Sequence, residues 1–390
     1  MATKRIRAAA TSVPSTAQQT SSAAADAIAG NDDLLTEILR LLPTRSLFKF
    51  KSVSKHWLKL ISSQDFSRRL NPNPTVSALF LPKSPHPHGP VFDVVPLDGK
   101  PSTAFPNLLP SVFILQSCNG LLCSDRYPEN KLNYYIYNPT THQFTLLPEL
   151  EADLFSTVAC VILAFDPRKS PDYKVLCVRL AYPLLNNHRI EIYSSKARSW
   201  RVSCESFTAT GGINFGKGVY WNGAIHWITN VRKKSVFSFD VDEERVIGET
   251  PMPVIRDWNR MSVRYFGECR GHLHLVLISG RQPWFIVYEM ERDYSGWFVK
   301  YKVDLGAVSS LFSDIRPNNY EELSKLRYRD LSILCLVREE KDEESFLVMR
   351  TPEVVVRYRF QDKTLKKLCD FTVRHARPEA YQYIETLAQV

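Results

Sequence analysis

Between residues 30 and 70 the apolar positions recur every three or four residues, which is the spacing of one face of an α-helix. The pattern predicts three or four short helices, with an N-cap among residues 31–33, a break at Pro43 and further caps at Thr44 and Ser54. A block of about 40 residues is close to the lower limit for folding alone without a disulfide or a metal. Its apolar residues exceed what three short helices can bury, so we expect another surface to complete this core.

Basic residues dominate the second half of this block. Lys51, Lys55 and Lys59 recur every four residues, which predicts one solvated stripe, and the only acid between residues 40 and 70 is Asp65. Such a surface suits a partner that has an apolar groove and an acidic rim.

The segments that flank the helical block differ from it in composition. Residues 1–29 are rich in Ala, Ser and Thr and lack an apolar period, so we predict a disordered tail. Residues 71–90 contain six prolines, which predicts a stiff, extended linker.

From about residue 111 the period of the apolar positions changes from helical to strand-like. Short β-rich runs alternate with turn residues, and an aromatic at the end of one run recurs at intervals of roughly 50 residues. These aromatics are Tyr137, Tyr193, Phe239, Tyr288 and Phe360.

Units of about four strands in roughly 50 residues are typical of β-propeller blades. Five are legible, and we expect a sixth from residues 75–116, closed by the C-terminal segment. The fold class is therefore predicted to be α+β multidomain. A small helical bundle over residues 30–70 is followed, after the linker, by an all-β, propeller-like domain of about six blades over residues 91–390.

Composition narrows the class of protein only a little. The chain is 44% hydrophobic with a net charge of +9, which permits either nucleic acid or an acidic protein as a partner. None of the eight cysteines forms a CxxC pair, so we expect reduced, buried thiols. The longest apolar run, residues 158–165, is too short to cross a bilayer, and we expect a protein of the cytoplasm or nucleus.

Candidate catalytic and ligand-binding patterns are incomplete. The stretch GGINFGKG, residues 211–218, resembles a phosphate-binding loop, but Gly218 stands where Ser or Thr would hold magnesium, so a turn between blades explains the glycines. His226, His272 and His274 lie in equivalent strands, where hydrogen-bonding histidines are commoner than metal ligands, and no third ligand is evident. We therefore predict no enzyme activity, no metal and no cofactor.

The helical block resembles an F-box. The resemblance rests on Leu42–Pro43, on Leu47, and on Val53 followed by Ser-Lys-x-Trp at residues 54–57. Gly30–Asn31 stand where family members usually carry Leu-Pro. The motifs CNGLLC, YNPTTHQFTLLP and EIYSSKARSWR are similar to the F-box-associated domains of plant F-box proteins, which are kelch-like in appearance.

The resemblance implies a non-catalytic substrate-recognition subunit of a Skp–cullin–F-box ubiquitin ligase. The F-box would dock on the acidic Skp-type adaptor, and through it on a cullin and a RING subunit. The β-domain would recruit a target protein for ubiquitination through loops such as residues 232–235 and 313–329. The adaptor-binding residues that the resemblance implies are Leu34, Leu35, Ile38, Leu42, Pro43, Leu47, Val53, Lys55 and Trp57.

Two other functions stay open at this point. A basic nucleic-acid-binding protein would use the lysines, although Val53, Trp57 and Ile61 lie among them as in a packing helix. A propeller enzyme or sugar-binding protein would instead bind a small ligand in the central funnel.

Overall fold

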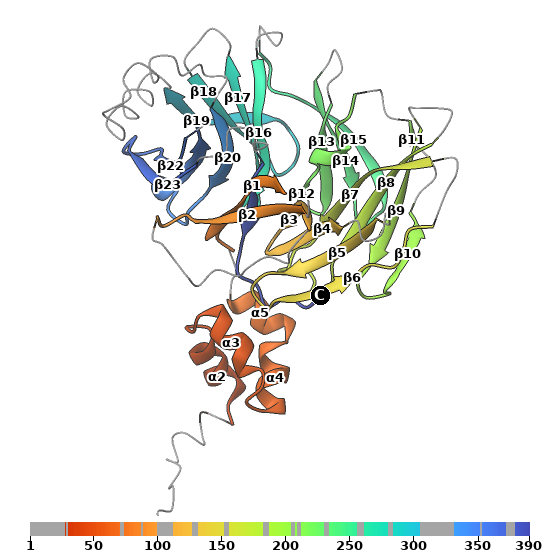
Figure 1. Ribbon diagram of the computed structural model, residues 1–390, viewed down its shortest axis with the longest axis vertical. Coiled ribbons are helices and arrows are strands. Elements are labelled where there is room, and N and C mark those ends of the chain that lie inside the picture. Colours follow the sequence, from red (N-terminus) through yellow and green to blue (C-terminus); the bar gives the residue numbers. More distant parts are fainter. Residues whose placement is uncertain are drawn as a thin grey trace, which may run out of the picture.

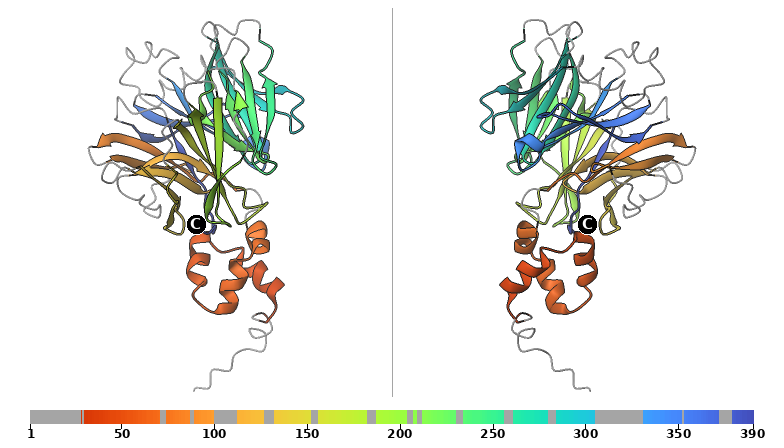
Figure 2. Two further views of the ribbon diagram at one scale, coloured as in Figure 1. Left: turned by 90° about the vertical axis from the view of Figure 1, so that its right-hand side faces the viewer. Right: turned by 90° about the vertical axis from the view of Figure 1, so that its left-hand side faces the viewer.

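The computed structural model consists of four short helices followed by a six-bladed β-propeller. Figures 1 and 2 show the helices as a separate lobe beneath the propeller, with α5 next to it. The residues that the structure describes are 28, 30–70, 74–86, 89–99, 112–126, 132–151, 156–181, 187–203, 207–208, 212–229, 234–255, 261–279, 284–304, 331–351, 353–371 and 379–390. The predicted disordered tail lies outside these residues, except for Ile28.

The helices are α2 (Asp32–Leu39), α3 (Thr44–Phe50), α4 (Lys55–Ile61) and α5 (Gln64–Leu70). At α2 and α4 the side chain of the N-cap residue binds free backbone amides of the first turn. The Asn31 side chain accepts hydrogen bonds from the backbone N–H groups of Asp33 and Leu34, each at 3.1 Å. Ser54 accepts one from the Trp57 N–H at 3.1 Å. The caps predicted among residues 31–33 and at Ser54 are therefore confirmed.

The cap predicted at Thr44 is wrong. Pro43 occupies the N-cap position of α3 and makes no side-chain cap bond, and Thr44 is the first helical residue. Proline has no backbone N–H, so it ends the preceding segment while its carbonyl still accepts bonds from the new helix. That carbonyl accepts from the Ser46 N–H at 2.8 Å and from the Leu47 N–H at 3.2 Å.

The core of the helical lobe contains a residue from the other end of the chain. Leu387 is buried in the same cluster as Leu35, Leu39, Leu47, Ile61 and Phe66. The expectation that another surface completes this core is thus met in part by the chain itself.

Five blades are antiparallel sheets of consecutive strands. Blade 2 contains β3 (Phe113–Cys118), β4 (Leu121–Arg126), β5 (Asn133–Asn138) and β6 (Gln143–Leu146). Blade 3 contains β7 (Ser156–Ala164), β8 (Lys174–Ala181), β9 (Asn187–Ser194), β10 (Ser199–Val202) and β11 (Phe207–Thr208), which pairs with β9. Blade 4 contains β12 (Val219–Trp221), β13 (Ala224–Ile228), β14 (Ser235–Asp240) and β15 (Arg245–Pro251).

Blades 5 and 6 follow the same order. Blade 5 contains β16 (Met261–Cys269), β17 (His272–Ser279), β18 (Trp284–Met290) and β19 (Trp297–Asp304). Blade 6 contains β20 (Ser332–Val337), β21 (Phe346–Arg350), β22 (Val354–Arg359) and β23 (Leu365–Asp370). The five aromatics that aligned the repeat lie near the end of the third strand of a blade, or directly after it for Phe360.

Blade 1 joins the two ends of the β-domain and closes the ring. Its sheet has the order β2-β1-β24, in which β1 (Ala78–His86) pairs with both β2 (Gly89–Pro96) and β24 (Tyr381–Tyr383). The expected sixth blade, closed by the C-terminal segment, is therefore confirmed. First strands of neighbouring blades contact one another, β24 with β3, β3 with β7, β12 with β16 and β16 with β20. A hydrophobic cluster fills each of the six contacts between neighbouring blades.

The predicted linker over residues 71–90 differs from the structure, because residues 78–86 form β1 and β2 begins at residue 89. Prolines are tolerated here because β24 pairs only with residues 78–80 of β1. The remainder of β1, including Pro82, has a single neighbour, and an edge position needs no N–H donor on its open side.

The glycine-rich stretch at residues 211–218 is a turn before a strand, as expected. Its described part holds the short 3₁₀ helix η2 (Phe215–Lys217) and leads directly into β12. A Cβ at Gly218 would lie 2.5 Å from Ile162 Cδ1 and 2.6 Å from Trp227 Nε1, so close packing requires this glycine.

Candidate docking face and polar clusters

The helical lobe exposes apolar side chains that its own core does not cover. On α2 these are Leu34 (49% exposed) and Ile38 (45%), which lie one turn apart on the same side of the helix, and Leu41 (79%) follows directly after the C-cap residue Arg40. Val53, between α3 and α4, is 59% exposed. An exposed apolar stripe on a small domain marks a surface suited to protein–protein contact.

The structure divides the predicted adaptor-binding residues into two groups. Leu34, Ile38, Pro43, Val53 and Lys55 are exposed. Leu35 and Leu47 are 4% and 0% exposed, and Leu42 and Trp57 pack against the same core. Trp57 also meets the Phe50 ring edge-on at 5.7 Å.

Burial corrects the direct role expected of Leu35 and Leu47. In α2 the leucines at positions 34 and 35 point to different sides of the helix, and only residue 35 faces α3 and α4. A side chain inside the bundle cannot contact a second protein, so these two leucines support the docking face from within.

The lysine stripe is also corrected in part. Lys51 is the C-cap residue of α3, whereas Lys55 and Lys59 lie on α4. The three lysines therefore do not share one helix, because the chain breaks between α3 and α4 at Ser54. Lys51 is half-buried in a crevice that Leu58, Gln143 and Val390 also line, and burial lowers its pKa. Lys55 and Lys59 remain exposed.

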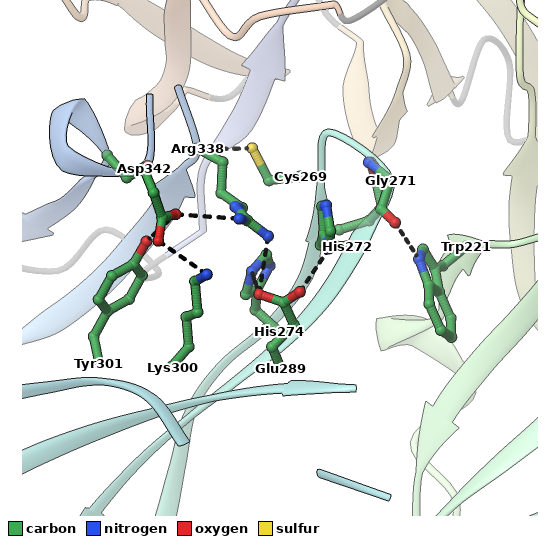
Figure 3. Close-up of polar contacts among 12 residues, drawn as sticks. Trp221, Cys269, Gly271, His272, His274, Glu289, Lys300, Tyr301, Arg338 and Asp342 are labelled. Carbon is green, nitrogen blue, oxygen red and sulfur yellow. Dashed lines mark hydrogen bonds and ion pairs between the residues drawn. The ribbon is translucent and has the colours of Figure 1, made fainter. Parts of the chain in front are cut away.

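The propeller contains a buried polar cluster between blades 5 and 6 (Figure 3). Glu289 on β18 lies at its centre and is almost fully buried. Its carboxylate oxygens lie 2.6 Å from His272 Nδ1 and 2.9 Å from Arg338 Nη1, and His274 Nε2 is 3.5 Å away. Burial opposes ionisation of Glu289, but these neighbours outweigh it and hold its pKa well below its usual range.

Arg338 links this cluster to a second carboxylate. Its Nη2 lies 3.1 Å from Asp342, which also contacts Lys300 Nζ at 2.9 Å and accepts a hydrogen bond from the Tyr301 hydroxyl at 2.6 Å. The cluster therefore cross-links β18, β19 and the segment after β20, as Figure 3 shows. Both carboxylates of the cluster are paired with cationic or hydroxyl groups, which is typical of a structural network.

The three histidines that the sequence singled out are not brought together as metal ligands. His272 and His274 share Glu289, whereas His226 lies in blade 4 and contacts the Tyr294 hydroxyl at 3.2 Å. Among the residues that the structure describes, no group of three or more His, Cys, Asp or Glu could hold a metal ion. The described helices are likewise all too short and too polar to cross a membrane.

His226 makes the stability of the propeller dependent on pH. Burial lowers its pKa to about 4. The folded protein therefore binds fewer protons than the unfolded chain, whose histidine has a pKa near 6.5. The contribution of neutral His226 to the free energy of unfolding is fully present above about pH 6.5. It falls by about 3 kcal/mol as the pH drops toward 4.

We expect His226→Gln to lose part of this acid sensitivity when chemical unfolding is measured at pH 7.5 and pH 4.5. The matched control is His56→Gln, because His56 lies on the exposed surface of α4. An equal loss of stability on acidification in the His226→Gln variant and the unaltered protein would contradict the assignment.

A helical lobe with exposed apolar side chains and a closed six-bladed propeller define the architecture of this two-domain chain. Two protein-family models match the chain: residues 31–69 match the F-box domain, and residues 75–267 match the F-box associated beta propeller domain. The chain belongs to the F-box protein family.

Relatives from Arabidopsis thaliana support this assignment along the whole chain. F-box protein At5g07610 is 33% identical and aligns with 95% of this chain and 94% of its own length. F-box protein At5g49610 is 26% identical and aligns with 73% of this chain and 82% of its own length. The matching family model describes the β-domain as an F-box associated beta propeller. The kelch-like character of this domain stays a prediction.

Sequence reasoning missed the residues that join the two domains. On α5, Arg68 Nε donates to the Arg168 carbonyl and Gln64 Nε2 to the Lys169 carbonyl, both at 2.8 Å. Arg45 Nη2 lies 3.4 Å from the Tyr383 hydroxyl. These contacts join segments that are far apart in the chain, so no local pattern could reveal them.

Proposed function

We propose that this chain is the substrate-recognition subunit of a Skp–cullin–F-box ubiquitin ligase. Its F-box helices dock on a Skp-type adaptor, and its propeller recruits a target protein for ubiquitination. Such a subunit does no bond chemistry. It raises the effective concentration of the target near the ubiquitin-charged enzyme, which requires geometry rather than an active site.

The observation that carries the proposal is the exposed apolar stripe of the helical lobe. Leu34 and Ile38 project from α2, whose other side is buried, and Leu41 follows the helix. All three stay uncovered although the chain has a large propeller beside the lobe. Apolar side chains at the centre of an interface supply most of its binding energy, and charges at its rim mainly steer association.

The two domains divide the roles of docking and recruitment. Asn119 in blade 2, and Tyr173 and Ser195 at the ends of β8 and β9 in blade 3, line a crevice of about 700 Å³ together with Gln64 and Ser67 of α5, so this end of the blades faces the helical lobe. The opposite ends of the blades extend away from the helical lobe in Figure 1, and we assign target recruitment to them. The loops predicted to bind the target, residues 232–235 and 313–329, lie outside the described residues except for residues 234 and 235.

The direct test is binding of the full chain to a recombinant plant Skp-type adaptor, measured by calorimetry and by co-purification. A stable complex supports the proposal. Failure of the folded chain to bind any adaptor tested, together with tight and salt-dependent binding of DNA or RNA, would favour the nucleic-acid alternative.

The exposed lysines of α4 should act on the rate of association. Lys55→Glu with Lys59→Glu reverses two exposed charges on α4. We expect association with the acidic adaptor to slow by about tenfold at low salt, and the difference to shrink as salt is added. Stopped-flow kinetics at two ionic strengths measures this effect.

The matched control for this variant is Lys302→Glu with Lys367→Glu, which makes the same charge change on outer strands of the propeller. An equal slowing in the control would show that the net charge of the chain, and not the rim of the docking face, controls association.

A further inference from the structure

Residues 384–390, here called the clasp segment, leave β24 and run between the propeller and the helices. Ile384 packs in the cluster between blades 6 and 1. Leu387 lies in the core of the helical lobe and is 6% exposed, and Ala388 and Val390 pack against the cluster between blades 2 and 3. One short segment therefore contributes side chains to three separate hydrophobic clusters.

The propeller holds the clasp segment through its backbone. Asn138, at the end of β5, is fully buried, and its Nδ2 donates to the carbonyls of Thr386 at 3.1 Å and Ala388 at 2.8 Å. The Thr386 N–H donates to Thr140 Oγ1 at 3.2 Å. The other side-chain atom of Asn138, Oδ1, accepts from the N–H groups of Thr140 and Thr141 at 2.9 and 3.3 Å.

The clasp segment passes so close to blade 2 that a side chain at residue 120 would clash with its backbone. A Cβ at Gly120 would lie 2.6 Å from the Ile384 carbonyl oxygen. Gly120 has a φ of 92° and, with Asn119, forms the tight turn between β3 and β4. The path of residues 384–390 is thus determined by packing as well as by hydrogen bonds.

The clasp segment adds a buried apolar side chain to the hydrogen bonds that join the two domains. The hydrogen bonds of Gln64 and Arg68 to the propeller lie at one helix, and exposed polar contacts alone allow two domains to move. Leu387 is the side chain from the propeller's closing segment that enters the helical core. Removing it leaves a cavity and frees the helical lobe to rotate.

We infer that the clasp segment, through Leu387 and its partner Asn138, fixes the orientation of the propeller relative to the adaptor-docking helices. These are positioning residues for the proposed ligase function, on which the inference rests. Because the adaptor fixes the helices in the assembly, the clasp segment determines where the propeller places its bound target.

The test measures the distance between the two domains in the full chain. Spin labels are placed at Lys59→Cys on α4 and Glu243→Cys in blade 4, both at exposed positions. The native cysteines that the structure describes are buried or partly buried, and burial raises the pKa of Cys369 to about 11, so they label poorly. Cys204 lies outside the described residues and is replaced by serine in all samples.

Two variants remove the clasp in different ways. Leu387→Ala deletes the apolar anchor, and Leu387→Met is its volume-conserving control. Asn138→Asp keeps the acceptor for Thr140 and Thr141 but loses both donations to the clasp segment. We expect one narrow distance distribution in the otherwise unaltered chain and in Leu387→Met, and a broad or shifted one in Leu387→Ala and Asn138→Asp.

Two further measurements separate positioning from folding. Leu387→Ala should keep the melting temperature of the propeller, and its affinity for the adaptor reports whether the helical lobe stays folded. A narrow, unshifted distribution in this variant overturns the inference, as does a broad distribution in the chain that carries only the labels. Loss of adaptor binding by the chain with an intact clasp segment would instead overturn the proposed function, so the two failures are distinguishable.

Discussion

Adaptor binding is expected to be abolished when Ile38 and Val53 are both replaced by aspartate. The two side chains are 45% and 59% exposed, so the change should leave the helical core intact. Truncation of an apolar residue at the centre of an interface costs about 2 kcal/mol or more. An aspartate adds the cost of burying an unpaired carboxylate against the apolar groove of the adaptor. Calorimetry with the full chain measures the loss.

The control for this prediction is Val299→Asp on β19, an outer strand of the propeller. Val299 is 46% exposed, which is close to the exposed fraction of Ile38. The control therefore also replaces an exposed apolar side chain by aspartate, but on the propeller. Adaptor binding should survive it. Undiminished binding by the Ile38 and Val53 double variant would show that the adaptor contacts another surface.

Substitution of Leu47 would give a less direct result. Leu47 is fully buried in the helical core, so Leu47→Ala would weaken binding by unfolding the lobe rather than by removing a contact. The exposed residues are therefore the ones that test the docking face.

Trp227→Ala is expected to destabilise the propeller by about 3–5 kcal/mol. Trp227 on β13 is fully buried between blades 3 and 4. Its Nε1 donates to the Phe215 carbonyl at 3.0 Å, and the Phe215 ring meets it edge-on at 5.5 Å. The variant loses the largest side chain of this contact and leaves the Phe215 carbonyl without its donor. Chemical unfolding of the full chain measures the effect.

Trp284→Ala is the matched control for this second prediction. Trp284 begins β18 and is 40% exposed, so its removal leaves no enclosed cavity. We expect a far smaller loss of unfolding free energy. Equal losses in the two variants would contradict the view that the contacts between blades determine the stability of the ring.

The spacing of apolar residues was enough to predict the main elements. The recurring aromatics, from Tyr137 to Phe360, are a local signal, because each marks the same strand of a repeated unit and strand patterns have a period of two. Helix caps such as Asn31 and Ser54 are equally local, since the side chain bonds to an N–H two or three residues away.

Predictions from local sequence patterns were wrong where the position of a residue in a sheet or a helical bundle determines its structure. The prolines of residues 71–90 indicate a linker in isolation, but Pro82 and Pro85 lie in the part of β1 that lacks a second neighbour. Lys51 matches the period of Lys55 and Lys59, but it lies on a different helix and is half-buried beside Val390.

The sequence by itself determined the class of the two domains, the repeat that forms the blades and the set of residues from which the docking face is drawn. Only the tertiary structure decided that Leu34 faces outward and Leu35 inward, that His272 and His274 share Glu289 whereas His226 contacts Tyr294, and that Leu387 completes the helical core. The reason is that hydrophobic spacing reports which side chains must be buried, whereas their burial partners depend on contacts between segments hundreds of residues apart.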